Sequence, residues 1–383
     1  MLQSNTEIFF DLIKAGLWGT KVQLSNYDGI DFFSVMKLAE DQSVVGLVTA
    51  GIVVANDSWF VVHGSPLVPQ QWSLQFFGQA LQLEQRNQAM NTFVASLVGK
   101  MRTAGIYTLL VKGQGIAQCY EKPLWRSCGD VDLFLNDENY EKAKAFLLPL
   151  ASSVEEEYER EKHLGMTLDG CVVELHGHLY SGLSSRVEKE LDALQEDTFY
   201  GGHVRSWMNG KTQVFLLKAE NDVFYVFTHI LQHFYKGGIG LKQICDWCRL
   251  MWTYKDSQNY GLLEQRIKRA GLMSEWKAFG ALAIEYLGFP KDSMPLLNVD
   301  VDLNANLKRK ADRIMKFILK SGNMGHNRDM SHFSKYPYLI RKCVSMGRRI
   351  GDLINHARIF PLDSLRFFPR IMWNGIRSAM RGE

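Results

Sequence analysis

The chain has 383 residues, of which 46% are hydrophobic and 22% charged, enough for one large core or two to three smaller ones. Its net charge of only +3 gives no indication that the chain binds nucleic acid or another acidic partner. The charge is uneven, because ten Lys and Arg against three Asp and Glu between Lys335 and Glu383 give that end +7 and leave about −4 for the rest.

Neither a targeting segment nor a membrane span is expected from the sequence. The first residues lack the charged and then apolar order of a signal peptide. The longest apolar run, Val44 to Ala55, has 12 residues and is too short to cross a bilayer. Six cysteines in a chain of this length without a secretion signal are typical of reduced thiols, so we expect a cytoplasmic protein.

The first part of the chain, residues 1–105, has a helical pattern. Apolar residues recur at helical spacing from Phe9 to Leu17, and residues 70–104 are long enough for one helix or two. No residue in this part carries an evident chemical role. We therefore expect a helical scaffold here.

Two acids interrupt a short apolar run that follows Gly129. Residues 131–135 are apolar apart from Asp132, which predicts a buried strand. Because side chains in a strand alternate between faces, Asp130 and Asp132 project from the same face. Two buried carboxylates need cations to compensate their charge, and such oxygen-rich pairs suit Mg²⁺.

A third acid, Glu174, lies in the apolar run from Cys171 to Leu175. Residues 163–168 and 172–179 are expected to form an antiparallel hairpin through Asp169-Gly170, a favoured two-residue turn. That hairpin would bring Glu174 beside Asp132. The three acids are the predicted catalytic residues and metal ligands, able to hold two metal ions.

A glycine turn precedes the acids. Residues 106–111 are strand-like, Lys112-Gly113-Gln114-Gly115 follows, and residues 116–120 are helical in pattern. Backbone N–H groups at such a turn favour phosphate oxygens, which makes Gly113 and Gln114 the predicted phosphate contacts. For the cation Arg126 we favour phosphate contact over pairing with a nearby acid, whereas for Lys112 both alternatives stay open.

The chain resembles, at these residues, the nucleotidyltransferases of the DNA polymerase beta superfamily, whose pattern is a strand, a glycine turn, an Asp-x-Asp strand and a later third acid. More narrowly it is similar to an uncharacterised bacterial branch found beside surface-polysaccharide genes. The residues that carry this likeness are Leu110-Val111-Lys112-Gly113, Tyr120, Arg126, Gly129-Asp130-Val131-Asp132-Leu133 and Val173-Glu174-Leu175-His176. The pattern departs from the superfamily at Gln114, where Ser or Gly is usual, and at Glu174, where Asp is commoner.

The resemblance implies an α+β fold with a polymerase-beta-like mixed sheet in residues 106–210, between helical regions in residues 1–105 and 211–383. It also implies Mg²⁺-dependent, or Mn²⁺-dependent, transfer of a nucleoside monophosphate from an NTP to a hydroxyl of a small-molecule, sugar or protein acceptor. Nucleic acid is not expected as acceptor, because no basic stripe interleaved with aromatic residues borders the acids. The alternative is an inactive binding or regulatory protein of the same fold in a polysaccharide system.

Three further clusters of histidine, cysteine or carboxylate residues each allow two interpretations. Glu174-x-His176-x-His178 has the spacing of a transition-metal cluster, but a structural or substrate-contact role is favoured for His176 because carboxylates dominate there. His229 and His233 share a helix face, where histidines are usually packed, although the resemblance implies contact with nucleotide or acceptor. The pair Cys245-x-x-Cys248 lies in a helical pattern without further ligands, which favours two small helix residues over a zinc site.

The remainder, from Thr212 to about Gly322, is expected to be helical. The last segment, from Tyr338 to Arg381, mixes basic residues with Phe and Trp. Such a segment is compatible with peripheral contact to an anionic membrane or with a partner.

Overall fold

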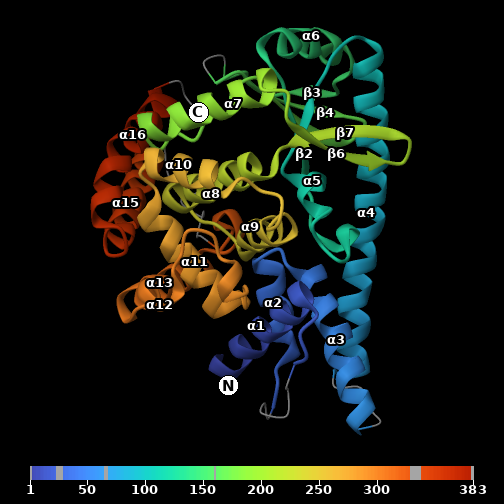
Figure 1. Ribbon diagram of the computed structural model, residues 1–383, viewed down its shortest axis with the longest axis vertical. Helices are drawn as coiled ribbons and strands as arrows, with labels where there is room; N and C mark the ends of the chain where they lie inside the picture. The colour runs from blue at the N-terminus through green and yellow to red at the C-terminus, as the bar shows by residue number, and fades with distance from the viewer. Residues whose placement is uncertain (1, 23–28, 64–67, 159–160, 328–337, 381–383) are drawn as a thin grey trace.

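A computed structural model describes residues 2–22, 29–63, 68–158, 161–327 and 338–380 (Figure 1). The first elements are α1 (Leu2–Trp18), α2 (Phe32–Asp41), α3 (Val45–His63), α4 (Gln70–Thr103), β1 (Leu109–Val111), α5 (Gly113–Ala117), the 3₁₀ turn η2 (Pro123–Trp125), β2 (Asp130–Phe134), α6 (Asp137–Leu147), η3 (Leu148–Leu150), β3 (Ser153–Val154), β4 (His163–Leu168) and β5 (Cys171–His176). The later ones are α7 (Ser185–Tyr200), β6 (Val204–Asn209), β7 (Thr212–Leu217), α8 (Ala219–Lys236), α9 (Leu241–Thr253), α10 (Tyr260–Ala270), α11 (Met273–Leu287), η4 (Lys291–Ser293), α12 (Val299–Asp302), α13 (Ala305–Ser321), η5 (Asn323–Gly325), α15 (Tyr338–Ala357) and α16 (Pro361–Met380).

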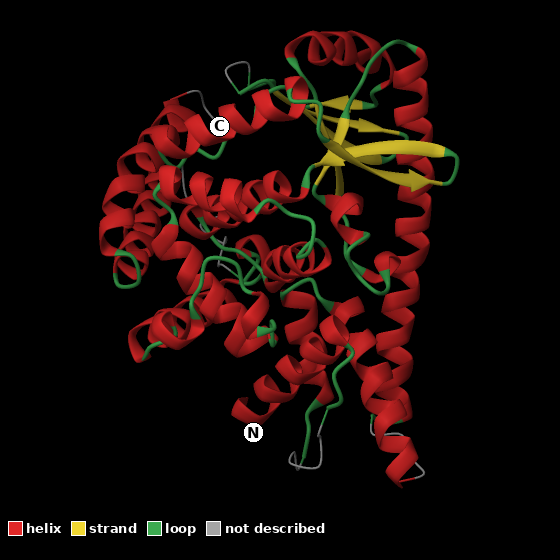
Figure 2. Cartoon of the chain, in the orientation of Figure 1, coloured by secondary structure: helices red, strands yellow, loops and turns green. Residues whose placement is uncertain are grey.

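The strands form one mixed seven-stranded sheet in the order β3-β4-β5-β2-β1-β7-β6, surrounded by helices (Figure 2). The pairs β2–β5 and β1–β7 are parallel, and the other neighbours are antiparallel. The predicted α+β class with a mixed sheet is therefore confirmed.

Helices α4 and α6 cover one face of the sheet. Their apolar side chains, from Met90 to Met101 on α4 and from Tyr140 to Leu147 on α6, form one core with the strand residues that point the same way. Helix α4 is a single helix of 34 residues and runs from the sheet to the N-terminal helices (Figure 1). Helix α6 begins after Asn136, whose side chain accepts a hydrogen bond from the Asn139 N–H.

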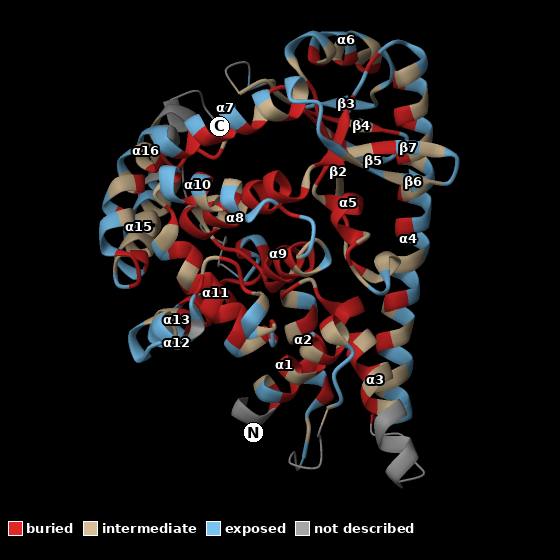
Figure 3. Ribbon diagram, in the orientation of Figure 1, coloured by how far each residue is buried: buried red, intermediate tan, exposed pale blue. Residues whose placement is uncertain are grey.

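The N-terminal helix α1 packs against α9 and α11 from the second half of the chain. The Trp18 indole donates to the Leu287 carbonyl at 2.6 Å, and its ring meets Trp252 edge-on. Arg249 of α9 is buried in the same contact, and its guanidinium donates a hydrogen bond of 2.7 Å to the Leu17 carbonyl. Residues of α1–α3, α8–α11 and α13 thereby share one apolar core, whose buried positions run through the middle of the molecule (Figure 3).

The sheet extends further along the chain than the sequence predicts. Residues 212–217, expected to open a helical region, form strand β7, which pairs with β6 in a hairpin and with β1 in parallel. The expectation of helix at residues 212–217 is wrong, because the apolar residues Val214, Leu216 and Leu217 are buried in the sheet rather than along a helix face. The predicted boundary after residue 210 falls inside this hairpin.

Helices α15 and α16 end the described chain. Among the residues described here, no helix combines the length and the apolar character that crossing a membrane requires.

Cys245 and Cys248 are both buried in α9, and burial raises the pKa of each thiol, as expected for packed helix residues.

Candidate functional site

The three predicted acids meet on the sheet face opposite α4 and α6. Strands β2 and β5 are parallel neighbours, and their register places Asp132 directly beside Glu174. Oxygen atoms of Asp130, Asp132 and Glu174 all lie within 4.8 Å of one another. The predicted convergence of these side chains is confirmed, while their catalytic and metal-binding roles stay predictions.

The hairpin that delivers Glu174 has the predicted turn. Asp169 and Gly170 have positive φ values of 48° and 79°, as the two central residues of a tight hairpin turn require. The turn fixes the pairing of Leu168 with Cys171 and thereby of every later pair between β4 and β5. Because side chains alternate, Val173 and Leu175 then face the core and Glu174 faces away from it.

Lys112 is the nearest cation to the acids. Its Nζ lies 2.8 Å from Asp132 Oδ1, in a pair of which both members are largely buried. Burial lowers the pKa of Lys112, but Asp132 above all, with Tyr225 and Glu174, outweighs that effect and leaves its pKa raised. Lys112 is thus paired with an acid of the site rather than with an exposed acid of its own loop, and it neutralises part of the buried charge.

The acids differ in protonation tendency. Repulsion from Asp132, with burial, raises the pKa of Asp130. Hydrogen bonds from His163 and His176 hold the pKa of Glu174 far below its ordinary value. Burial would raise the pKa of Asp132, but Lys112 and His176 together lower it. Asp132 and Glu174 are consequently anionic at neutral pH.

His176 lies between two of the carboxylates. Its Nε2 is 2.8 Å from Asp132 Oδ1 and 3.4 Å from Glu174 Oε2. Burial lowers the pKa of His176, but these two acids raise it more. His178 does not join this cluster, because its Nε2 is bound to Asp192 Oδ1 at 2.8 Å.

His163 is a site residue that sequence reasoning missed. It opens β4 directly across from His176, and its Nε2 lies 3.1 Å from Glu174 Oε2. The sequence contained the signal for this pairing. A two-residue turn at Asp169-Gly170 pairs residue 168 with 171, and counting back five residues on one strand and forward five on the other pairs 163 with 176.

Helix α8 contributes a second side to the site. The Lys112 Nζ lies 5.9 Å from the Tyr225 ring centroid, and the rings of His229 and His233 are 4.4 Å apart. Burial and then the charge of Lys112 lower the pKa of both histidines, that of His233 to about 4. The imidazoles of α8 are therefore neutral at pH 7. Tyr225, like His163, is a residue of the site that the sequence analysis did not single out.

The predicted phosphate turn adjoins the acids through its backbone. A Cβ at Gly113 would lie 3.5 Å from the Asp130 carbonyl oxygen, and Gly113 has a positive φ of 41°. The Gln114 side chain turns into the core, where only 1% of the residue is exposed and the amide contacts Met90 Sδ. The Gln114 side chain is therefore part of the core, and the phosphate contact predicted for the backbone of this turn stays a prediction.

Arg126 occupies a different environment from the predicted one. It is buried, and Nε and Nη2 form a forked pair with Asp246 on α9, while Nη1 donates to Cys128 Sγ. Tyr120 Oη donates to the same Asp246 at 2.8 Å. Three guanidinium nitrogens therefore have partners inside the fold, an arrangement that ties the loop before β2 to α9 and favours a structural role over phosphate contact.

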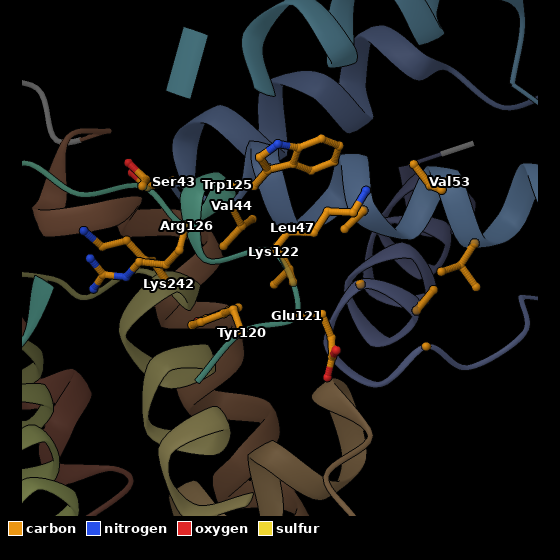
Figure 4. A pocket seen from close by; sticks show the side chains of 17 residues that line it. Ser43, Val44, Leu47, Val53, Tyr120, Glu121, Lys122, Trp125, Arg126 and Lys242 are labelled. Atoms are coloured by element: carbon orange, nitrogen blue, oxygen red, sulfur yellow. The ribbon is translucent and has the colours of Figure 1, made fainter. Parts of the chain in front are cut away.

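A mainly apolar cavity of about 120 Å³ lies between the N-terminal helices and this loop (Figure 4). Its labelled walls include Leu47 of α3, Val44 just before that helix, and Trp125 of η2. Lys242 of α9 borders the cavity, and its charge opposes the rise in the pKa of Asp130 that Asp132 and burial cause. Lys242 thus connects the cavity with the acid cluster.

The donor set fits a hard divalent cation. Three carboxylates supply only oxygen ligands, and two of them have lowered pKa values, so that they need no proton loss to bind a metal. Asp130, Asp132 and Glu174 are the residues that would hold Mg²⁺ or Mn²⁺.

Comparison with known proteins gives one match. Residues 28–288 match a family model described as an uncharacterised nucleotidyltransferase. No curated protein and no solved structure matches the chain. The matched residues include the sheet, the three acids, Lys112 and the first helices after the sheet.

Proposed function

Because the chain belongs to a family of uncharacterised nucleotidyltransferases, we propose that it moves a nucleoside monophosphate from an NTP to a hydroxyl group, with Mg²⁺ held by Asp130, Asp132 and Glu174. The observation that carries this proposal is the approach of three carboxylates within 4.8 Å beside a glycine turn. A bound Mg²⁺ would neutralise phosphate charge and align the attacking and leaving oxygens. Mn²⁺ would serve with the same ligands.

The chain's own residues would bind and orient the nucleotide. Backbone N–H groups of Gly113 and Gln114 would meet phosphate oxygens next to Asp130. Lys112 would hold its proton throughout, because its pKa is raised, and keep Asp132 in place. The very low pKa of Glu174 favours a ligand role for it over acceptance of the acceptor's proton.

The neutral imidazoles of α8 give the site hydrogen-bonding groups without adding charge. His229 and His233 lie near Lys112 and Glu174, whose charges affect their pKa values. We assign them to contact with the nucleotide or the acceptor. The acceptor class stays a small molecule, a sugar or a protein, and we assign the apolar cavity bordered by Lys242 to part of it.

The alternative is a protein that keeps the fold and binds partners without catalysis, in a polysaccharide biosynthesis system. Titration calorimetry with each NTP, in Mg²⁺ and in EDTA, separates the two. Transfer chemistry requires nucleotide binding that depends on the metal. Absence of any metal-coupled binding for all NTPs would favour the alternative.

Peripheral membrane contact is a second proposal, supported by the surface of α15. Met346, Ile350 and Ile354 recur every four residues on this helix and are exposed. The segment from residue 335 onward also carries a formal charge of +7. An apolar stripe within a basic segment is the pattern that favours an anionic lipid surface.

A further inference from the structure

A second group of metal-ligating side chains lies beside the acid cluster. Ligand atoms of His163, Glu174 and His176 are within 4.8 Å of one another. We propose that these three residues bind a transition-metal dication of the Zn²⁺ type, at a site separate from Asp130 and sharing only Glu174 with the acid cluster. This proposal does not depend on nucleotidyl transfer by the chain.

The backbone places the three side chains on one face of the sheet. His163 is the antiparallel partner of His176, and Glu174 precedes His176 by two residues, so that all three project the same way. The residue of β4 opposite Glu174 is Gly165, which has no side chain to separate His163 from the carboxylate. The Glu155 carboxylate reaches over this glycine, 2.5 Å from where its Cβ would lie, and adds negative charge at the same place.

The distances agree with ligands arranged around one ion. Glu174 Oε2 lies 3.1 Å from His163 Nε2 and 3.4 Å from His176 Nε2. Two ligand atoms that are each about 2.1 Å from one ion lie about 3.0 Å apart at a right angle and about 3.4 Å apart at the tetrahedral angle. The two distances to Oε2 are thus those of ligands to one ion, and the ligand atoms of the two histidines lie within 4.8 Å of each other.

The donor chemistry separates this group from the acid cluster. Imidazole nitrogen favours Zn²⁺ and its first-row neighbours, whereas carboxylate oxygens alone suit Mg²⁺. Two histidines and one carboxylate, each partly accessible, leave a position for water or substrate. The pair of sites would therefore hold different metals, with Glu174 as the residue common to both.

The test uses the full chain after EDTA has removed bound metal. Co²⁺ is titrated into it in excess Mg²⁺ and its binding is measured by visible absorption. Binding of Zn²⁺ under the same conditions is measured by calorimetry. We expect one ion per chain. His163→Gln should weaken binding of both ions at least about tenfold. The matched control is His178→Gln, which changes a histidine on the same segment that is bound to Asp192 instead, and it should bind as the wild type does.

A second variant separates this site from the proposed catalytic one. Asp130→Asn should weaken Mg²⁺-dependent NTP binding and leave the Co²⁺ spectrum unchanged. The proposal is overturned if the wild type binds neither Co²⁺ nor Zn²⁺ in excess Mg²⁺, if His163→Gln binds like the wild type, or if Asp130→Asn removes the Co²⁺ spectrum. Should His163→Gln fail to fold, X-ray absorption of the wild type with Zn²⁺ decides the matter: two imidazole ligands support the site, and fewer overturn it.

Discussion

Asp132 and Glu174 lie side by side on the parallel strands β2 and β5, at one register position of the sheet. They are separated by 42 residues in the sequence, and their common face is set by two local features. The alternation of apolar residues fixes the face of Asp132, and the turn at Asp169-Gly170 fixes the face of Glu174. A slip of one residue in either strand would bury one carboxylate in the core under α4.

Asp132→Asn is expected to abolish Mg²⁺-dependent NTP binding and transfer. The change removes a charged ligand and leaves the partly buried Lys112 without its 2.8 Å partner. Calorimetry measures binding, and circular dichroism checks folding. The control is Asp137→Asn at an exposed position of α6, which should bind as the wild type does. Full activity of Asp132→Asn would exclude the assignment of Asp132.

Arg126→Ala is expected to lower the free energy of unfolding by roughly 3 to 5 kcal/mol, because it leaves the buried Asp246 without its forked partner. Urea denaturation measures the change. Lys142→Ala, which breaks an exposed pair with Glu138 on α6, should change the free energy of unfolding far less, because water screens that pair. A small effect of Arg126→Ala on stability together with a large loss of NTP affinity would restore the phosphate role.

Stability should depend on pH through His233. Its pKa is about 4 in the folded chain against 6.5 as the ordinary value, owing to burial and to Lys112, Lys236 and Lys242, with Glu174 opposing. Between these values the unfolded chain binds more protons, so that stability falls as pH decreases from about 6.5 to about 4.

His233→Gln removes this contribution. The free energy of unfolding of the wild type minus that of the variant should be constant above about pH 7 and decrease toward pH 4, by at most about 3 kcal/mol. Chemical denaturation at a series of pH values measures it. Gln232→Ala on the same helix carries no titrating group and should show a constant difference. Parallel curves for wild type and His233→Gln would contradict the lowered pKa.

Gly46 is required by close packing between α3 and the loop before β2. A Cβ there would lie 2.0 Å from the Trp125 carbonyl oxygen, a backbone atom that cannot move aside alone. Gly46→Ala should destabilise the chain by about 1 to 3 kcal/mol in urea denaturation. Gly78→Ala on α4 meets nothing within 4 Å and should instead stabilise it by about 0.5 to 1 kcal/mol. Equal effects of the two changes would contradict the packing.

Lipid binding by the C-terminal helices is tested by pelleting with anionic and with neutral vesicles. The full chain should pellet with anionic vesicles, and a chain truncated before Tyr338 should not. Ile350→Asp and Ile354→Asp place charges in the exposed stripe of α15 and should weaken pelleting without changing the fold. No difference between the full and the truncated chain would remove the idea.

The sequence by itself determined the features that depend on neighbouring residues. Alternation predicted strand β2 and the common face of Asp130 and Asp132, and the Asp169-Gly170 turn predicted the hairpin. These features follow from the geometry of a strand and a turn, in which each residue's direction depends on positions close along the chain.

Only the tertiary structure decided which distant groups meet. Residues 212–217 form a strand because the backbone of β1, on the side not paired with β2, forms a parallel pair with them. Arg126 pairs with Asp246 of α9, which lies 120 residues further along the chain. Charge pairing and burial act across space, so the partner of a buried cation follows from the packing of helices and strands and not from the spacing of residues along the chain.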